Sequence, residues 1–312
     1  MAYNGTEEER AARVAQELIV KLKLENATAS KLRTLFRHIA KDVTKVYSAT
    51  GTVIDAELYR SEVEGILKTA YRRSMEYFGS DLSDHLKENA KNGKDPLIAA
   101  LYLLAIQRDR TVEQQIRIEQ TKKDNYLHEY MNEVVPEKAD QITQTNNKRI
   151  AESVAFAAGL SAISEKPQSQ HEIAVAAGKD FWESNEYRGQ LIAQDAVSDG
   201  SESAKLIEVS SMDETLNEVR NQGIADVQAI KTWVTAGDDK VREAHIEADG
   251  QEQNIDDAFE VDGELLMKPR DTSLGASAGN TINCRCSAVY TFDGDVVRES
   301  GDGEDSGFFA PD

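Results

Sequence analysis

The C-terminal third of the chain contains the stretch Trp233-Val234-Thr235-Ala236-Gly237-Asp238-Asp239-Lys240-Val241-Arg242-Glu243-Ala244-His245, followed by Ala248-Asp249-Gly250. Two shorter pieces come after it, Lys268-Pro269-Arg270-Asp271 and Asn283-Cys284-Arg285-Cys286. Apolar residues alternate, imperfectly, over 227–235, which predicts a half-buried strand. Asp238 is placed to cap a helix over about 238–248, which Gly250 would end.

The residues after this helix predict a hairpin and a final strand. Asp262-Gly263 separates two short apolar runs, and Asp-Gly is a strong hairpin signal. Over 281–292 the even positions are apolar or cysteine, so they would share one face of a strand. Residues 294–312 are rich in Gly and Asp and predict a disordered acidic tail.

The first two thirds of the chain predict helices. Apolar residues recur at spacings of three and four from residue 6 to about 194, and Pro136 is expected to end or kink a long helix over 97–135. The polar, small-residue stretch 195–203 predicts a loop or linker. The fold class is therefore α+β. Its expected parts are a helical domain (1–135), a helical connector (136–194), an α+β domain (195–293) and the tail (294–312).

Charge is unevenly spread along the 312 residues, whose net charge is −20. Residues 195–312 carry 27 acidic and 9 basic side chains, a balance of −18. Such a segment is a poor general binder of DNA, because nonspecific affinity comes from neutralising phosphates. The N-terminus is acidic and polar, unlike a secretory signal. No run of eighteen apolar residues occurs, so no membrane span is expected.

His245, Cys284 and Cys286 carry the ligand types that zinc prefers. On a regular strand, however, Cys-x-Cys holds its Cα atoms about 7 Å apart, which is wide for one ion unless a bulge intervenes. Both cysteines are therefore expected to be small buried apolar residues, and no cofactor is expected. The alternative is a zinc site formed by these three residues, with Asp238 or Asp271 as a fourth ligand.

Asp238, Arg242 and His245 would fall on one stripe of the predicted helix, at i, i+4 and i+7. They are expected to form an ion-pair and hydrogen-bond cluster facing the cysteine-bearing strand. The alternative is a solvated Asp–Arg pair worth a few tenths of a kcal/mol. No nucleophile–base–oxyanion set is evident, so no catalytic residue is expected.

The order and spacing of the pieces resemble the C-terminal domain of the phage Mu F-like minor head proteins, also called phage head morphogenesis proteins. The resemblance extends over roughly 140–292 and is strongest over 217–290. The matching positions are Trp233, Asp238, Arg242, His245, Gly250, Pro269, Asp271, Asn283, Cys284, Arg285 and Cys286. The resemblance implies that these residues are structural and that the chain is a non-enzymatic minor capsid protein.

The same resemblance implies a virion component in the head near the portal vertex, made in the host cytoplasm. Its partners would be the portal protein and other head proteins, and packaged double-stranded DNA, without a membrane. It would act in head assembly and in DNA packaging or ejection. Two alternatives stay open. One is a metal-dependent hydrolase or transferase using His245, Cys284 and Cys286. The other is an internal DNA-binding head protein that uses basic helical clusters such as Arg108 with Arg110, or Lys122-Lys123.

Overall fold

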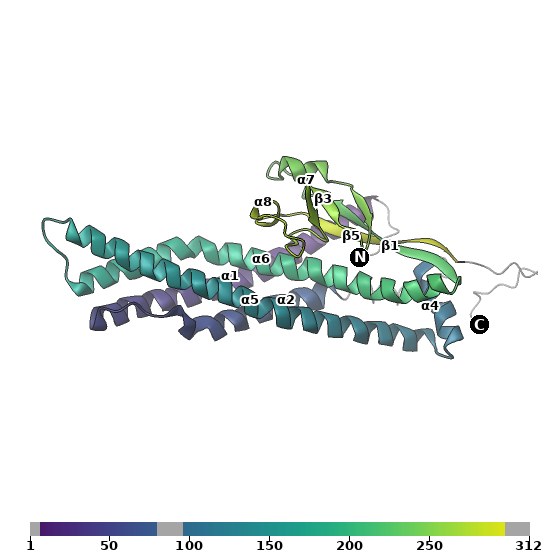
Figure 1. Ribbon diagram of the computed structural model, residues 1–312, viewed down its shortest axis with the longest axis horizontal. Coiled ribbons are helices and arrows are strands. Elements are labelled where there is room, and N and C mark those ends of the chain that lie inside the picture. The colour runs from purple at the N-terminus through teal and green to yellow at the C-terminus, as the bar shows by residue number, and fades with distance from the viewer. Residues whose placement is uncertain (1–6, 80–95, 297–312) are drawn as a thin grey trace, which may run out of the picture. The chain divides into compact units, whose positions relative to one another are not determined.

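A computed structural model describes residues 7–79 and 96–296 of the chain (Figure 1). Long helices precede a small antiparallel β part, which confirms the α+β class. In order, the elements are α1 (Glu7–Thr50), η1 (Ala56–Tyr59), α2 (Arg60–Phe78), α4 (Pro96–Gln107), α5 (Val112–Ala162), α6 (Gln170–Asn221), β1 (Ala225–Val234), α7 (Glu243–Glu247), β2 (Glu252–Asn254), β3 (Phe259–Val261), β4 (Glu264–Leu266), α8 (Ala278–Thr281) and β5 (Ser287–Val296).

The chain forms two compact units, each assembled from separate segments. Among the described residues, the helical unit comprises 16–73 and 129–198, and the mixed unit comprises 7–15, 74–79, 96–128 and 199–296. The predicted ranges 1–135, 136–194 and 195–293 are continuous stretches instead, and their independence as folded domains stays a prediction. Among the described helices, none is both long and apolar enough to cross a membrane.

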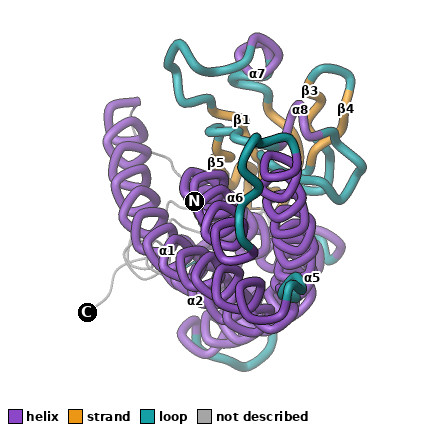
Figure 2. Tube along the Cα trace, turned by 90° about the vertical axis from the view of Figure 1, so that its left-hand side faces the viewer, coloured by secondary structure: helices purple, strands orange, loops and turns teal. Residues whose placement is uncertain are grey.

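The helical unit packs segments of α1, α2, α5 and α6 side by side (Figure 2). The apolar spacing of three and four on α1 faces this interior, where Leu32, Phe36 and Ile39 are fully buried. Helix α5 runs through Pro136, so the proline does not end a helix there. The long helix predicted over 97–135 also has other bounds, because α4 ends at Gln107 and α5 begins at Val112. Val135, just before the proline, is buried, and such packing offsets the loss of one backbone hydrogen bond.

Gly178 of α6 allows a close approach to α1 in the helical unit. A Cβ atom at Gly178 would lie 2.2 Å from Thr44 Oγ1 and 2.7 Å from the Ala40 carbonyl oxygen. Gly178→Ala is therefore expected to destabilise the protein by about 1–3 kcal/mol, because α1 or α6 must shift. Urea unfolding followed by circular dichroism measures the change.

Gly159 of α5 is the matched control for Gly178. Nothing lies within 4 Å of a Cβ atom built at Gly159. Gly159→Ala is expected to stabilise the helix by about 0.5–1 kcal/mol, since alanine has less backbone freedom to lose. Equal effects of the two substitutions would contradict a close contact at Gly178.

The mixed unit is built on a three-stranded antiparallel sheet in the order β2-β1-β5. Strand β1 is buried at alternate positions, including Val227, Ala229 and Trp233, which confirms the predicted half-buried strand. Tyr290 and Phe292 of β5 join the same core. Apolar side chains of α4 and α6 complete it: Leu97, Leu101, Leu104, Val209, Met212 and Leu216.

The predicted hairpin is also present, because β3 pairs with β4 in antiparallel register. Asp262 has φ 53° and Gly263 has φ 72°, so both turn residues are left-handed. Two left-handed residues are what a type I′ hairpin turn requires, and Asp-Gly adopts that conformation readily.

Residues 195–203 lie inside α6, so the predicted loop or linker is wrong. Most of the small and polar side chains that suggested a linker are buried, and Ser201 and Glu202 are fully buried. The buried Glu202 carboxylate has polar partners, because it accepts hydrogen bonds from Ser287 Oγ and from the Ala288 amide, each at 2.9 Å. This stretch is thus a buried helix face with polar partners, which composition alone does not distinguish from a linker.

Two other predicted elements have different bounds. The helix expected over 238–248 is the short α7, because Gly237 is left-handed and Asp238 accepts the Lys240 amide in a turn. The strand expected over 281–292 begins only at Ser287. The short helix α8 precedes it, and Ile282 is exposed. Of the predicted tail, residues 294–296 belong to β5, and residues 297–312 lie outside the described part of the chain.

Candidate functional site

The separate motif pieces converge at one end of β1. The amide of Gly250, which is left-handed with φ 78°, donates to the Trp233 carbonyl oxygen at 2.8 Å. This bond returns the chain beside β1 after α7, the helix that carries His245. The Trp233 ring lies edge-to-face with the rings of His245 at 5.7 Å and Phe259 at 5.3 Å. His245 is therefore held in the core beside an aromatic pair.

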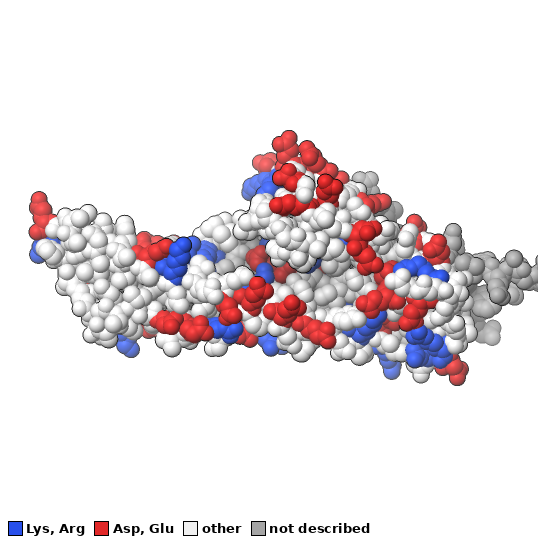
Figure 3. All heavy atoms as spheres, viewed as in Figure 1, with Lys and Arg blue, Asp and Glu red and all other residues white. Residues whose placement is uncertain are grey.

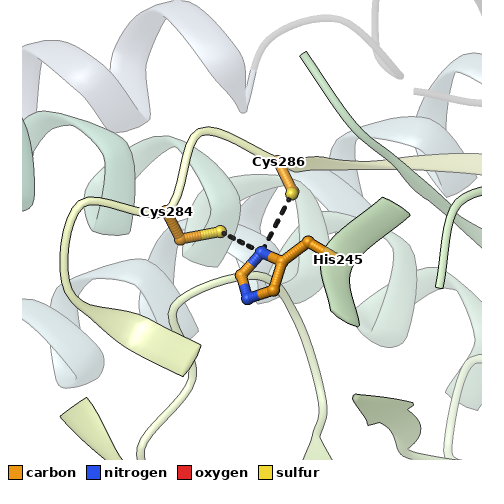
Figure 4. A group of neighbouring side chains, drawn as sticks. All are labelled: His245, Cys284 and Cys286. Carbon is orange, nitrogen blue, oxygen red and sulfur yellow. Dashed lines mark hydrogen bonds between the residues drawn. The ribbon is translucent and has the colours of Figure 1, made fainter. Parts of the chain in front are cut away.

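His245, Cys284 and Cys286 form one buried cluster (Figure 4). His245 Nδ1 lies 3.3 Å from Cys286 Sγ and 3.6 Å from Cys284 Sγ. The three ligand atoms lie within 4.8 Å of one another, and the residues are 1%, 2% and 4% exposed. Both cysteines are free thiols. Both cysteines are buried, as expected from the sequence, and the structure also brings together the three residues of the alternative zinc site.

The two thiols interact strongly in this small space. The hydrogen bond from Cys286 to Cys284, assisted by His245, holds the pKa of the Cys284 thiol well below its usual range. The same bond together with burial raises the pKa of the Cys286 thiol. The two thiols are therefore coupled, because the proton on Cys286 stabilises a thiolate on Cys284.

The loop over 282–286 is held from three directions. Arg242 donates to the Ile282 carbonyl oxygen, and Arg270 Nε donates to the Cys284 carbonyl oxygen at 2.7 Å. Arg285 forms a bidentate ion pair with Asp238. The hydrogen bond from Arg285 is the largest cause that lowers the pKa of the Asp238 carboxyl group. The two cysteines are therefore positioned by contacts on both sides of each.

The polar cluster predicted for Asp238, Arg242 and His245 does not arise from one helix face. Asp238 lies outside α7, so Asp238, Arg242 and His245 do not share a helix face. Each of the three nevertheless contacts one residue of the loop over 282–286: Arg242 contacts Ile282, His245 contacts Cys286, and Asp238 contacts Arg285. The partner of Asp238 is Arg285 rather than Arg242, and this pair is about two-fifths exposed on both sides.

The remaining motif residues form turns. Asn283 is left-handed with φ 55°, a conformation that asparagine tolerates better than most residues. Pro269 lies in a turn closed by the Asp271 amide on the Lys268 carbonyl oxygen. The Asp271 carboxylate accepts the Met267 and Ser273 amides. Asp238 and Asp271 thus have other partners, and neither belongs to the His–Cys–Cys cluster among the described residues.

A set of buried or partly buried charged side chains in the mixed unit was missed from the sequence. The nitrogen–oxygen distances are 2.7 Å for Lys268 with Asp199, 3.0 Å for Lys205 with Glu202 and 2.8 Å for Arg220 with Asp213. The spacing of the α6 members of this set indicates a buried helical face. Residues 199, 202, 209, 213, 216 and 220 follow one helical face, although Gly200 and three nearby serines disguise it.

Lys231 was also missed, because it occupies an inward position of β1. Its side chain is fully buried, and Nζ donates to the carbonyl oxygens of Ile255 at 3.0 Å and Met267 at 2.9 Å. The ammonium group also lies 5.1 Å from the Phe259 ring centre. Burial lowers the pKa of Lys231 to about 8, against an ordinary value of 10.5.

This shift makes a testable contribution to stability. The folded pKa lies below the unfolded one, so between pH 8 and 10.5 the unfolded chain binds more protons and stability rises with pH. Relative to Lys231→Met, the wild type is expected to gain about 2 kcal/mol from pH 7 to pH 10. Urea unfolding of both proteins at each pH measures the difference. A constant difference between them would contradict the shifted pKa.

Residues 184–289 match the family described as Phage Mu protein F like protein, and this range contains every motif residue named above. One curated relative is the NAD(+)–arginine ADP-ribosyltransferase EFV of Enterococcus faecalis (strain ATCC 700802 / V583). It is 33% identical over 64 residues, which make up 20% of this chain and 12% of the relative. No solved structure matches the chain. The stretch of the chain that is similar to this family, residues 184–289, therefore includes the buried His–Cys–Cys cluster.

Proposed function

We propose that the chain is a structural minor head protein of a tailed phage or prophage. It acts in head morphogenesis at the portal vertex, where it takes part in DNA packaging or ejection. The match of residues 184–289 to the Phage Mu protein F like family carries this proposal. The protein is a virion component on this view, and its partners are the portal protein and other head proteins.

The contacts of the motif residues support a structural role over a hydrolase or transferase. Asp238, Arg242 and Gly250 contact neighbouring segments of the same unit, as an architectural motif does. His245 and the two cysteines are at most 4% exposed, so the described structure leaves a substrate no access to them. A reaction would need a group that touches substrate, and these three side chains do not reach the surface.

The contacts of several basic residues weigh against the internal DNA-binding alternative. Lys122 and Lys123, which the sequence nominated for phosphate contact, pair with Glu214 at 2.6 Å and Glu208 at 3.7 Å on α6. Arg108 forms an ion pair with Glu218. Their charge is therefore partly neutralised within the mixed unit, which reduces their contribution to nonspecific DNA binding.

The end of the hairpin formed by α5 and α6 offers a surface for another head protein. Phe156 and Ile163 are 58% and 83% exposed, and Leu160 and Val175 are about half exposed. No charged residue occurs over 153–164. At the left of Figure 3 the surface is mostly white, with one acidic and one basic group at its extremity. We call it the apolar tip, defined by Phe156, Leu160, Ile163 and Val175. Such exposed apolar patches typically mark protein–protein contacts.

A phage lacking the gene, complemented in trans, tests the proposal. Wild-type protein is expected to restore infectious particles and to be found in purified heads by quantitative mass spectrometry. Phe156→Asp together with Ile163→Asp is expected to lower the copies per head roughly tenfold or more, because charge on an apolar contact weakens binding by at least about 1.4 kcal/mol.

Leu58→Asp is the matched control, since Leu58 is 73% exposed in the helical unit but lies in η1 outside the apolar tip. It is expected to leave incorporation unchanged. Equal incorporation of the tip variant would reject the apolar tip as the contact. Normal infectious heads without the gene product would reject the head function itself. DNA binding by the purified protein that weakens steeply with salt would favour the internal DNA-binding alternative.

A further inference from the structure

We propose that His245, Cys284 and Cys286 bind one zinc ion, which clamps α7 to the loop that leads into β5. This site would be structural, and the inference does not depend on the proposed role in the phage head. It rests on the positions of the three ligand atoms, on their unsatisfied chemistry, and on the way the surrounding segments hold them.

The distances between the ligand atoms suit a shared zinc ion. With Zn–S about 2.3 Å, Zn–N about 2.0 Å and tetrahedral angles, a bound sulfur and nitrogen lie about 3.5 Å apart. His245 Nδ1 is 3.3 Å from one sulfur and 3.6 Å from the other. In Figure 4 both sulfurs point toward this one nitrogen. Both nitrogen–sulfur distances therefore match those around a bound zinc ion.

One hydrogen bond at His245 Nδ1 cannot serve both sulfurs that lie near it. Neutral Nδ1 has one lone pair or one proton, so it makes one good hydrogen bond and not two. Cys284 and Cys286 both approach it from within the core, at 2% and 4% exposure. A zinc ion would contact all three atoms at once. Two thiolates would neutralise its charge, so the buried site would carry no net charge.

The local backbone removes the reason to doubt a Cys-x-Cys zinc site. Cys284 and Cys286 lie before β5, so the wide spacing of a regular strand does not apply to them. Left-handed Asn283 bends the loop, and Arg270 binds the Cys284 carbonyl oxygen. Beyond the cysteines, Glu202 binds the Ala288 amide. These contacts position both sulfurs in advance, as supporting residues commonly do at metal sites.

The ligand set indicates which metal and which role. Two sulfurs and one imidazole nitrogen favour zinc over the hard cations magnesium and calcium. Among the described residues no further His, Cys, Asp or Glu joins the group, so the fourth position would hold water. His245 and Cys284 are 39 residues apart, so the ion would close a long loop and stabilise the mixed unit.

Metal analysis of the full-length protein tests the proposal directly. Protein purified without chelator is expected to contain close to one zinc per chain. The chain has only two cysteines, so every thiolate–metal signal must come from this site. Titration with a mercurial thiol reagent is expected to release one zinc per two thiols. Cobalt added to the metal-free protein is expected to produce thiolate-to-cobalt charge-transfer absorption, and EDTA is expected to lower the melting temperature.

Variants separate loss of a ligand from loss of the fold. Cys284→Ser with Cys286→Ser, and separately His245→Ala, are expected to lose the zinc and the response of the melting temperature to EDTA. Phe259→Leu, beside Trp233 in the same core, is the control and is expected to keep its zinc while melting lower. Wild-type protein that neither contains zinc nor shows the charge-transfer absorption with cobalt would overturn the proposal, whatever the variants do.

Discussion

Replacing Glu202 with alanine is expected to lower the free energy of unfolding of the mixed unit by about 3–5 kcal/mol. Glu202 is fully buried on α6 and lies 3.0 Å from Lys205 Nζ. It also accepts hydrogen bonds from Ser287 Oγ and the Ala288 amide. The substitution leaves the buried Lys205 ammonium without its carboxylate and the Ala288 amide without its acceptor, and both losses are costly in a dry interior.

Trp233 fluorescence during urea unfolding measures this change. The chain has two tryptophans, and the Trp182→Phe background leaves Trp233 as the reporter of the mixed unit. Glu183→Ala is the control, because Glu183 pairs with Lys179 on the exposed surface of the same helix. The control is expected to change stability by at most about 1 kcal/mol. Equal effects of the two substitutions would contradict a buried ion pair at Glu202.

Trp233→Ala is expected to lower the free energy of unfolding by a similar amount, about 3–5 kcal/mol. Trp233 is fully buried and packs edge-on against His245 and Phe259. Alanine would leave a cavity at the end of β1, next to the His–Cys–Cys cluster, and the surrounding strands can close it only in part. Thermal unfolding followed by circular dichroism measures the loss.

Trp182→Ala is the matched control for Trp233→Ala. Trp182 lies in the helical unit, is only partly buried, and packs beneath the Arg37 guanidinium at 4.6 Å. Its removal is expected to cost clearly less, because a partly exposed site leaves no closed cavity. A smaller loss at Trp233 than at Trp182 would contradict the position of Trp233 in the core.

Glu202 and Trp233 both support residues next to the candidate zinc site. Lys205, paired with Glu202, donates to the Ala288 carbonyl oxygen at 3.1 Å, two residues after Cys286. The Trp233 ring lies against His245 itself. Loss of either side chain is therefore expected to weaken zinc binding indirectly, by loosening the ligands, whereas substitution of a ligand removes the binding outright.

Local sequence patterns determined those elements whose cause lies within a few residues. The Asp262-Gly263 turn followed from the two left-handed positions that a tight hairpin requires. Strand β1 followed from alternation, and the helices of the first two thirds followed from apolar spacing. The grouping of His245 with Cys284 and Cys286 as metal-ligand types was also readable, because it depends on side-chain chemistry alone.

Tertiary structure alone decided what depends on distant partners. The stretch 195–203 is helix because Glu202 and Asp199 meet Ala288 and Lys268, which are more than sixty residues away. No local pattern distinguishes such a buried polar face from a linker. The distance between His245 and the cysteines likewise depends on Arg242, Arg270 and the turn at Asn283, which bend the loop out of the strand that alternation predicted. Local propensity is weak beside such packing and hydrogen bonding, which is why the geometry of the site required the folded chain.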